Sequence, residues 1–133
     1  MSKVLNVKVW FWVVIVANGV FGALVGSLWA ADAAESWWGA ENVQNHDEIY
    51  ERMMGYLLFA MIFILVGIAV LVSGRVFSQL ALITSGSLLF VHLAIMLYGD
   101  ANGYGSPSEW VVPLVLDVVL AATAIRSLSQ PSV

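Results

Sequence analysis

The chain has 133 residues, of which 61% are hydrophobic and 11% are charged, with five Lys and Arg against nine Asp and Glu. Soluble domains are about 45–50% apolar and about 25% charged, and so short a chain has too little interior to hide the excess. Lipid is therefore the expected solvent. The net charge of −4 argues against a nucleic-acid partner, and the absence of Cys excludes disulfides and thiolate metal sites.

The first apolar run covers residues 9–31, which carry no charge. A bilayer core needs about 20 apolar residues, so this run predicts a membrane span. A signal peptide is the competing interpretation, but the apolar core of such a peptide is only about 7–15 residues long, and we expect an uncleaved span. Gly22 and Gly26 form a G-x-x-x-G pattern in register with Asn18, which indicates close packing against another helix.

Residues 32–52 form the one long polar segment, an expected outer loop with six acids and one Arg. Trp37 and Trp38 favour contact with the headgroup region, where amphipathic rings prefer to lie. Asn45 followed by Glu48 predicts a helix N-cap, so we expect the next helix to begin before the membrane. The acids around His46 lack the spacing of a metal site, and we interpret them as a solvated helix start.

Two further spans are predicted at residues 53–73 and 76–98, separated only by Gly74 and Arg75. A connection this short predicts a helical hairpin in which the two spans are antiparallel neighbours. The first of the two is rich in bulky Met and Phe side chains, so we expect it to make more lipid contact.

Residues 99–109 form a second outer loop, which is rich in glycine and predicts turns. Ser106, Pro107 and Glu109 then give a capping box with Pro at the first helical position, which starts a fourth span at residues 110–126. That span contains Asp117, the one acidic residue that a bilayer would bury.

Asp117 and His92 are predicted to lie at the same depth. Counting from Trp110 and Tyr98 at the outer boundary, a rise of 1.5 Å per residue puts both side chains roughly 9–10 Å inside the membrane. A buried acid is costly there and should face a partner. The pair could be a proton-sensitive or ligand-binding site, an interhelical hydrogen bond that only holds the helices together, or a contact of Asp117 with another subunit.

Other residues are candidates for supporting roles around this pair. Small residues on one face of a helix indicate helix contact, and polar groups inside a membrane need partners. The polar candidates are Asn18, Tyr56 and Ser85, and the packing candidates are Gly22, Gly26, Ala121 and Ala124.

The distribution of basic residues predicts the orientation. Four spans place both termini on one side, together with four of the five basic residues, Lys3, Lys8, Arg75 and Arg126. Only Arg52 lies on the other side. The positive-inside rule then predicts cytoplasmic termini. As a separate expectation, we assign the protein to a bacterial or archaeal cell membrane.

The sequence therefore predicts an all-α integral membrane protein, a single up-down-up-down four-helix bundle. It contains no P-loop, dinucleotide fingerprint, H-E-x-x-H or G-x-S-x-G motif, so no catalytic residues, metal or cofactor are assigned. The first hypothesis is a non-enzymatic accessory or structural subunit that binds other membrane subunits or copies of itself. A small oligomeric transporter or channel that uses Asp117 and His92 is the alternative, and an enzyme acting on a lipid or quinone-like substrate is the third.

In span count, and in the position of His92 late in the third span, the layout resembles small four-span bacterial families such as the DoxX-like proteins. The resemblance lies in the hydropathy pattern and implies a four-span membrane fold.

Overall fold

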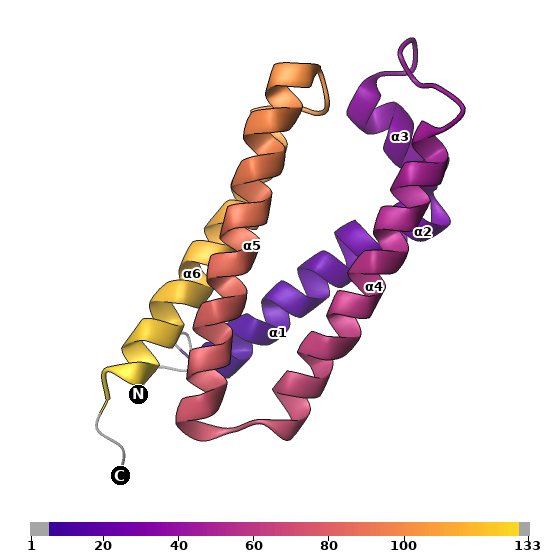
Figure 1. Cartoon of the computed structure of the whole chain (residues 1–133). Helices are drawn as coiled ribbons and strands as arrows, with labels where there is room; N and C mark the ends of the chain where they lie inside the picture. Colours follow the sequence, from indigo (N-terminus) through magenta and orange to yellow (C-terminus); the bar gives the residue numbers. More distant parts are fainter. Residues whose placement is uncertain (1–5, 131–133) are drawn as a thin grey trace.

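The computed structural model describes residues 6–130 and is helical almost throughout (Figure 1). Four helical runs are long and apolar enough to cross a membrane: Val7–Leu28, Asp47–Leu71, Gly74–Asn102 and Pro107–Leu128. No strand occurs in this part of the chain. The all-α class and the four apolar helices are thus confirmed, and they indicate an integral membrane protein.

The first run is not one regular helix. It consists of α1 (Val7–Ala17), the π-helix η2 (Asn18–Leu24) and α2 (Val25–Leu28), and α3 (Ala30–Trp38) follows after a break at Trp29. In η2 the side-chain amide of Asn18 donates to the Val14 carbonyl at 3.0 Å. Much of the expected outer loop 32–52 is therefore helical. Only residues 39–46 separate α3 from α4 (Asp47–Leu71).

The start of α4 differs from the prediction. The helix begins at Asp47 and not directly after Asn45. The Asp47 carboxylate accepts a hydrogen bond from the Gln44 N–H at 2.8 Å. This bond runs from the first residue of the helix back to the preceding loop, and the N-cap residue, His46, makes no side-chain capping bond, so the expected Asn45 cap does not form.

The remaining helices are α5 (Gly74–Asn102), the short 3-10 helix η3 (Pro107–Trp110) and α6 (Val111–Leu128). Gly74 has a φ of 65°, which a glycine adopts without strain, and this allows the tight turn after α4. At the start of η3 the Ser106 N–H donates to the Glu109 carboxylate at 2.7 Å, the reciprocal bond of the predicted capping box.

The helices pack in two groups. In the first group, η2, α2 and α3 pack on α4, and in the second group α5 packs on α6. A methyl group at Gly55 of α4 would lie 2.5 Å from the Ser27 nitrogen and 2.7 Å from the Gly26 carbonyl carbon, so the two backbones touch there. Helix α1 joins the groups by packing on α6, and its Phe11 ring meets Phe77 of α5 edge-on at 5.1 Å.

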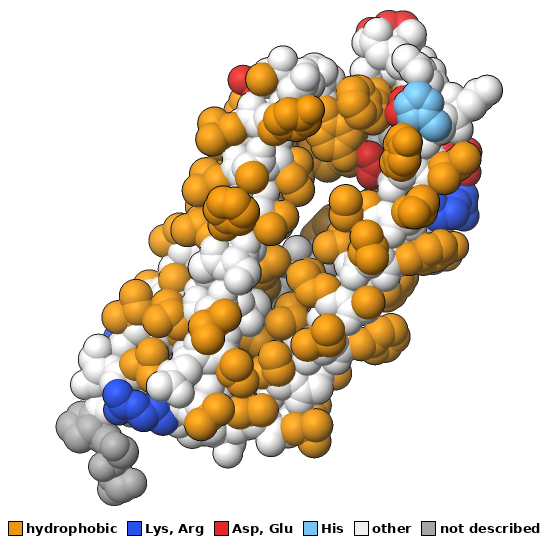
Figure 2. Space-filling model, viewed as in Figure 1, with side chains coloured by type: hydrophobic (Ala, Val, Ile, Leu, Met, Phe, Trp, Pro, Cys, Tyr) orange, Lys and Arg blue, Asp and Glu red, His pale blue; other side chains and the backbone are white. Residues whose placement is uncertain are grey.

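The predicted hairpin of the second and third spans forms only at its turn. Above that turn α4 and α5 diverge (Figure 1), and the space-filling view shows an open hollow between them (Figure 2). We call this space the lateral hollow. Helices α4 and α5 diverge because each packs more closely on another helix. Small residues let α2 approach α4, and α5 approach α6, more closely than the bulky side chains of α4 would let α5 approach. Helix α4 is accordingly the least buried of the four apolar helices.

Charge is segregated along the molecule. The ends of the described chain lie beside the α4–α5 turn (Figure 1), close in sequence to Lys8, Arg75 and Arg126. Acidic side chains lie at the opposite end, and apolar side chains cover the surface between the two ends (Figure 2). Lys3, another basic residue on which the predicted orientation depends, lies outside the described residues.

Candidate functional site

The central feature of the site is a contact between His92 of α5 and Asp117 of α6. His92 Nδ1 lies 2.6 Å from Asp117 Oδ2, a short hydrogen-bond distance. Asp117 is 1% exposed and His92 is 8% exposed. The two helices bring the side chains together because both residues lie on the buried face of their helix, on α5 with Ala81 and Ser85.

Only one of the two Asp117 oxygens is paired. Within residues 6–130, Oδ1 of Asp117 is buried and has no hydrogen-bond partner. An unpaired carboxylate oxygen away from water costs more than an unpaired neutral oxygen, because the charge loses its solvation. The pair therefore links α5 to α6 and leaves one buried carboxylate oxygen without a partner in the described chain.

A cluster of four aromatic residues begins beside His92. The Trp110 ring of η3 lies 5.8 Å from the His92 ring. Trp37 of α3 stacks between Trp110 and Tyr104, with ring centroids 5.3 and 5.2 Å apart, and Trp38 meets Tyr104 edge-on at 4.9 Å. We call Trp37, Trp38, Tyr104 and Trp110 the aromatic bridge, because it joins the two groups of helices at the end opposite the α4–α5 turn.

Polar contacts reinforce the bridge. The Gly105 N–H donates to the Trp37 carbonyl at 2.6 Å, and the Tyr104 hydroxyl donates to Glu51 of α4 at 2.8 Å. Burial, with the Glu51 carboxylate beside the phenol, raises the pKa of Tyr104 above its ordinary value, so this hydroxyl remains a donor. Gly105 has a φ of 65°, and a side chain there would meet the Trp37 ring.

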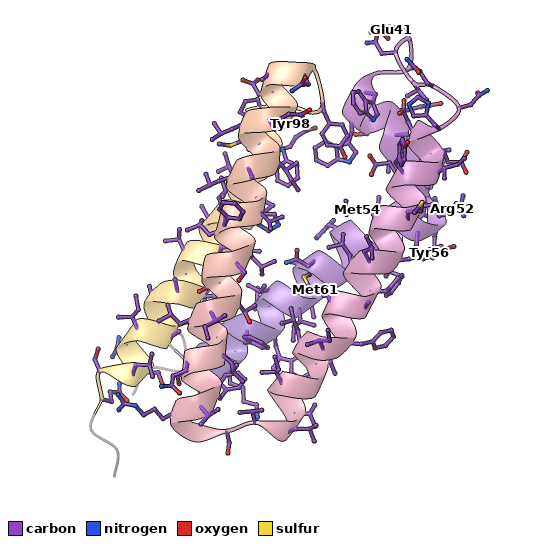
Figure 3. All side chains as sticks on the ribbon, viewed as in Figure 1. Glu41, Arg52, Met54, Tyr56, Met61 and Tyr98 are labelled. Carbon is purple, nitrogen blue, oxygen red and sulfur yellow. The ribbon has the colours of Figure 1, made fainter. Side chains whose placement is uncertain are left out.

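The three polar residues expected to support the pair lie elsewhere. Asn18 and Ser85 bond to carbonyls of their own helices, Val14 and Leu82 respectively. Tyr56 lies on the side of α4 that faces away from α5, beside Arg52 (Figure 3). No hydrogen bond in the described part of the chain connects any of the three to His92 or Asp117.

The predicted packing residues differ in how closely they approach another helix and in how deeply they are buried. Gly22 and Gly26 face α4: a methyl group at Gly22 would lie 2.9 Å from Leu58 Cδ1, and one at Gly26 would lie 3.3 Å from Gly55 Cα. Ala124 is fully buried, whereas Ala121 is only partly buried. Helix α6 also buries two residues that were not among the predicted contacts, Leu120 and Thr123.

The aromatic bridge and Gly55 were not predicted from the sequence. The expected place of Trp37 and Trp38 is the headgroup region, and Tyr104 falls in an expected loop. The rings that these residues contact belong to distant segments of the chain, and no repeating pattern in the sequence relates those segments. Gly55 does carry a signal, because it is a small residue in the otherwise bulky stretch of residues 53–59.

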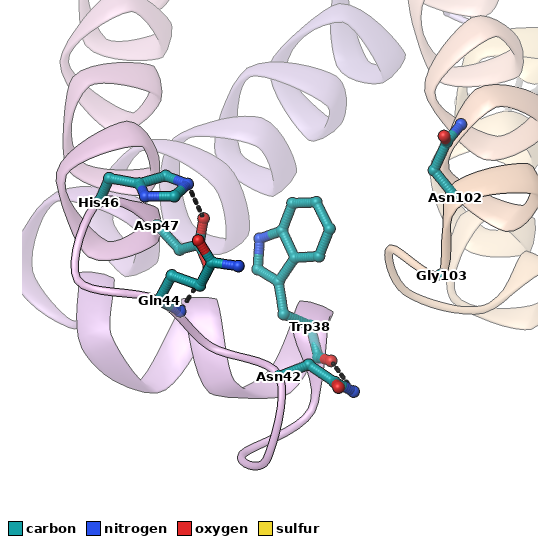
Figure 4. Close-up of a pocket in the computed structure, with 7 residues that line it drawn as sticks. All are labelled: Trp38, Asn42, Gln44, His46, Asp47, Asn102 and Gly103. Atoms are coloured by element: carbon teal, nitrogen blue, oxygen red, sulfur yellow. Dashed lines mark hydrogen bonds and ion pairs between the residues drawn. The ribbon is translucent and has the colours of Figure 1, made fainter.

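A second concave region lies at the acidic end. An open pocket of about 440 Å³ is bordered by Trp38, Asn42, Gln44, His46, Asp47, Asn102 and Gly103 (Figure 4). Both carboxylate oxygens of Asp47 already have partners, His46 at 3.2 Å and the Gln44 N–H at 2.8 Å. Within residues 6–130, no group of three or more His, Cys, Asp or Glu residues could hold a metal ion. The His92–Asp117 pair is therefore the stronger candidate site.

Comparison of the chain with protein families, curated proteins and solved structures gave no match. The hydropathy layout shared with the DoxX-like proteins consequently carries no family assignment, and function has to be inferred from the geometry described above.

Proposed function

We propose that this membrane protein is a non-enzymatic accessory subunit of a larger membrane complex. The lateral hollow carries this proposal, because the core shared by the four apolar helices lies toward the α4–α5 turn, and beyond it α4 and α5 diverge and leave much apolar surface uncovered. In a membrane, helices associate by close packing and not by exclusion of water, so an unfilled space between two helices favours a partner helix.

We also propose that both termini face the cytoplasm of a bacterial or archaeal cell. Lys8, Arg75 and Arg126 lie in sequence at the helix ends nearest the termini and the turn, and the positive-inside rule assigns this end to the cytoplasm. The acidic end with the aromatic bridge would then face outward, with Trp37 and Trp110 at the outer membrane boundary.

Photo-crosslinking in native membranes tests the accessory role. Phe63 of α4 and Phe90 of α5 are 72% and 74% exposed, so each can be replaced by benzoylphenylalanine, which keeps the aromatic ring. We expect both positions to give discrete protein adducts, and the same proteins should co-purify in fixed ratio in a gentle detergent. Glu41, an exposed residue of the outer loop, is the control position and should give no such adducts. Adducts with lipid alone, together with a monomer after purification, would contradict the proposal.

A further inference from the structure

We infer that the open pocket of about 440 Å³ at the acidic end, which we call the polar pocket, binds an uncharged sugar ring. This site is independent of the accessory role. Three features favour a sugar, namely the charge of the pocket lining, the free hydrogen-bonding groups in it and an aromatic ring at its centre. The volume is in the range of small-molecule sites.

The charge of the lining favours an uncharged ligand. The described residues that line the polar pocket include an indole and three side-chain amides but no Lys or Arg. The carboxylate of Asp47 already has partners, because one oxygen lies 3.2 Å from His46 Nε2 and the other accepts the Gln44 N–H at 2.8 Å. An anionic ligand would therefore meet a negative charge, and a cationic ligand would compete with bonds that are already formed.

The three amides offer the mixture of donors and acceptors that sugar hydroxyl groups need. The Gln44 side-chain amide makes no hydrogen bond within residues 6–130, so its oxygen and its nitrogen are both free. Asn42 and Asn102 each donate one hydrogen bond to the carbonyl four residues earlier, at 3.2 and 2.7 Å, which leaves their amide oxygens as acceptors. Gln44 and Asn102 lie on opposite sides of the pocket (Figure 4), so both groups of helices contribute to it.

Trp38 supplies an apolar surface between these amides. Its ring projects from the end of α3 into the space between the 39–46 loop and α5 (Figure 4). Tyr104 meets this ring edge-on at 4.9 Å and so covers at most one of its faces. The C–H groups of a sugar ring carry a partial positive charge and pack on the negative face of an aromatic ring. An aromatic face bordered by amides thus matches the apolar face and the polar rim of a sugar.

The position of the polar pocket makes it accessible from water and from lipid headgroups. Helix α4 begins at Asp47 and α5 ends at Asn102, so the pocket lies where two of the apolar helices end. With 29 residues at a rise of about 1.5 Å each, α5 is about 43 Å long and exceeds a hydrocarbon core of about 30 Å. The polar 39–46 loop favours the headgroup region for this end.

Two sources could supply the sugar: a dissolved glycoside or the headgroup of a glycolipid. The full chain is purified in lauryldimethylamine oxide, which has no sugar headgroup, and is reconstituted into phosphatidylcholine nanodiscs. Methyl β-D-glucopyranoside is the dissolved probe, and nanodiscs that also contain monoglucosyldiacylglycerol present the headgroup. The indole ¹⁵N–¹H signal of Trp38, assigned by its absence from Trp38→Phe, reports binding from either source.

We expect at least one source to shift the Trp38 signal saturably. Gln44→Ala and Asn102→Ala, which remove amides from opposite sides of the pocket, should each weaken binding about three- to tenfold, the loss expected for one hydrogen bond. Asn45→Ala is the matched control and should leave binding unchanged, since Asn45 is an exposed amide of the same loop that does not line the pocket. All three side chains are exposed, so we expect the variants to fold.

Glucose 6-phosphate tests the charge argument, because it presents the same ring with an anionic group and should bind more weakly than the glucoside. A response to the glycolipid alone would assign the sugar to a lipid headgroup, and a response to the glucoside alone would assign a dissolved sugar; either supports the site. No saturable shift with either source would contradict it. Equal affinities of Gln44→Ala, Asn102→Ala and Asn45→Ala, or tighter binding of glucose 6-phosphate, would also overturn the inference.

Discussion

At the scale of single residues, Asp117 and Gly55 are both buried, for different chemical reasons. Asp117 is buried, and one of its carboxylate oxygens is shielded from water and lacks a hydrogen-bond partner in the described chain. Gly55 is buried because no side chain fits between α4 and the backbone at Gly26 and Ser27. The first residue belongs to the candidate site, and the second lies where α4 packs on α2, the helix that precedes α3.

Replacement of Gly55 by Ala should destabilise the protein. The added methyl group would meet backbone atoms that cannot move away like a flexible side chain, and such overpacking costs about 1–3 kcal/mol. Gly67→Ala on the same helix is the control. It meets nothing within 4 Å and should be neutral or stabilise by up to about 1 kcal/mol. The free energy of unfolding in detergent, measured for both variants, checks this prediction. Equal stability of the two variants would contradict the close contact of α2 with α4.

At the scale of helices, the two groups of helices contact each other at both ends of the molecule and are separated in its middle by the lateral hollow. Below the lateral hollow they are joined by the α4–α5 turn and by α1, and above it by the aromatic bridge. Trp37 contributes most to the bridge, since its ring stacks on two others and its carbonyl accepts the Gly105 N–H. The bridge therefore determines how far apart the outer ends of α4 and α5 stand.

Trp37→Ala should increase the distance between the outer ends of α4 and α5. The chain has no Cys, so spin labels can be placed at Ile49→Cys and Leu97→Cys without other substitutions. Double electron–electron resonance should give a longer or broader distance distribution in the Trp37→Ala background. Labels at Leu71 and Val76, beside the turn, should be unaffected. An unchanged distance between the outer labels would show that other contacts hold the two groups together.

The sequence predicts where each helix lies along the chain better than it predicts which helices pack together. The spans can be found because each apolar run is long enough to cross a bilayer, and the break at Gly74 is visible as a turn. The G-x-x-x-G pattern marks a contact face but not its partner, which the structure identifies as α4. The predicted hairpin overestimates the contact of α4 with α5, because a short turn joins two ends without determining the packing farther along.

The candidate site shows the same limit. Depth can be counted along each helix, so His92 and Asp117 can be matched from the sequence alone. Depth does not determine rotation, and Tyr56, an expected partner of the pair, lies on the far side of α4. The aromatic bridge depends on rings contributed by α3, the 103–106 loop and η3, and only the assembled chain brings these segments together.

At the scale of the whole molecule, we propose that four apolar helices cross a membrane with the acidic end outside and both termini inside. Labelling of single cysteines with a membrane-impermeant thiol reagent tests this claim most directly, because the unsubstituted chain has no Cys. Asn42 and Ser129 are exposed residues at the opposite ends, in the outer loop and after α6. In intact cells we expect Asn42→Cys to be labelled at once and Ser129→Cys only after permeabilisation. Labelling of both positions in intact cells, or of Ser129→Cys alone, would contradict the proposed orientation.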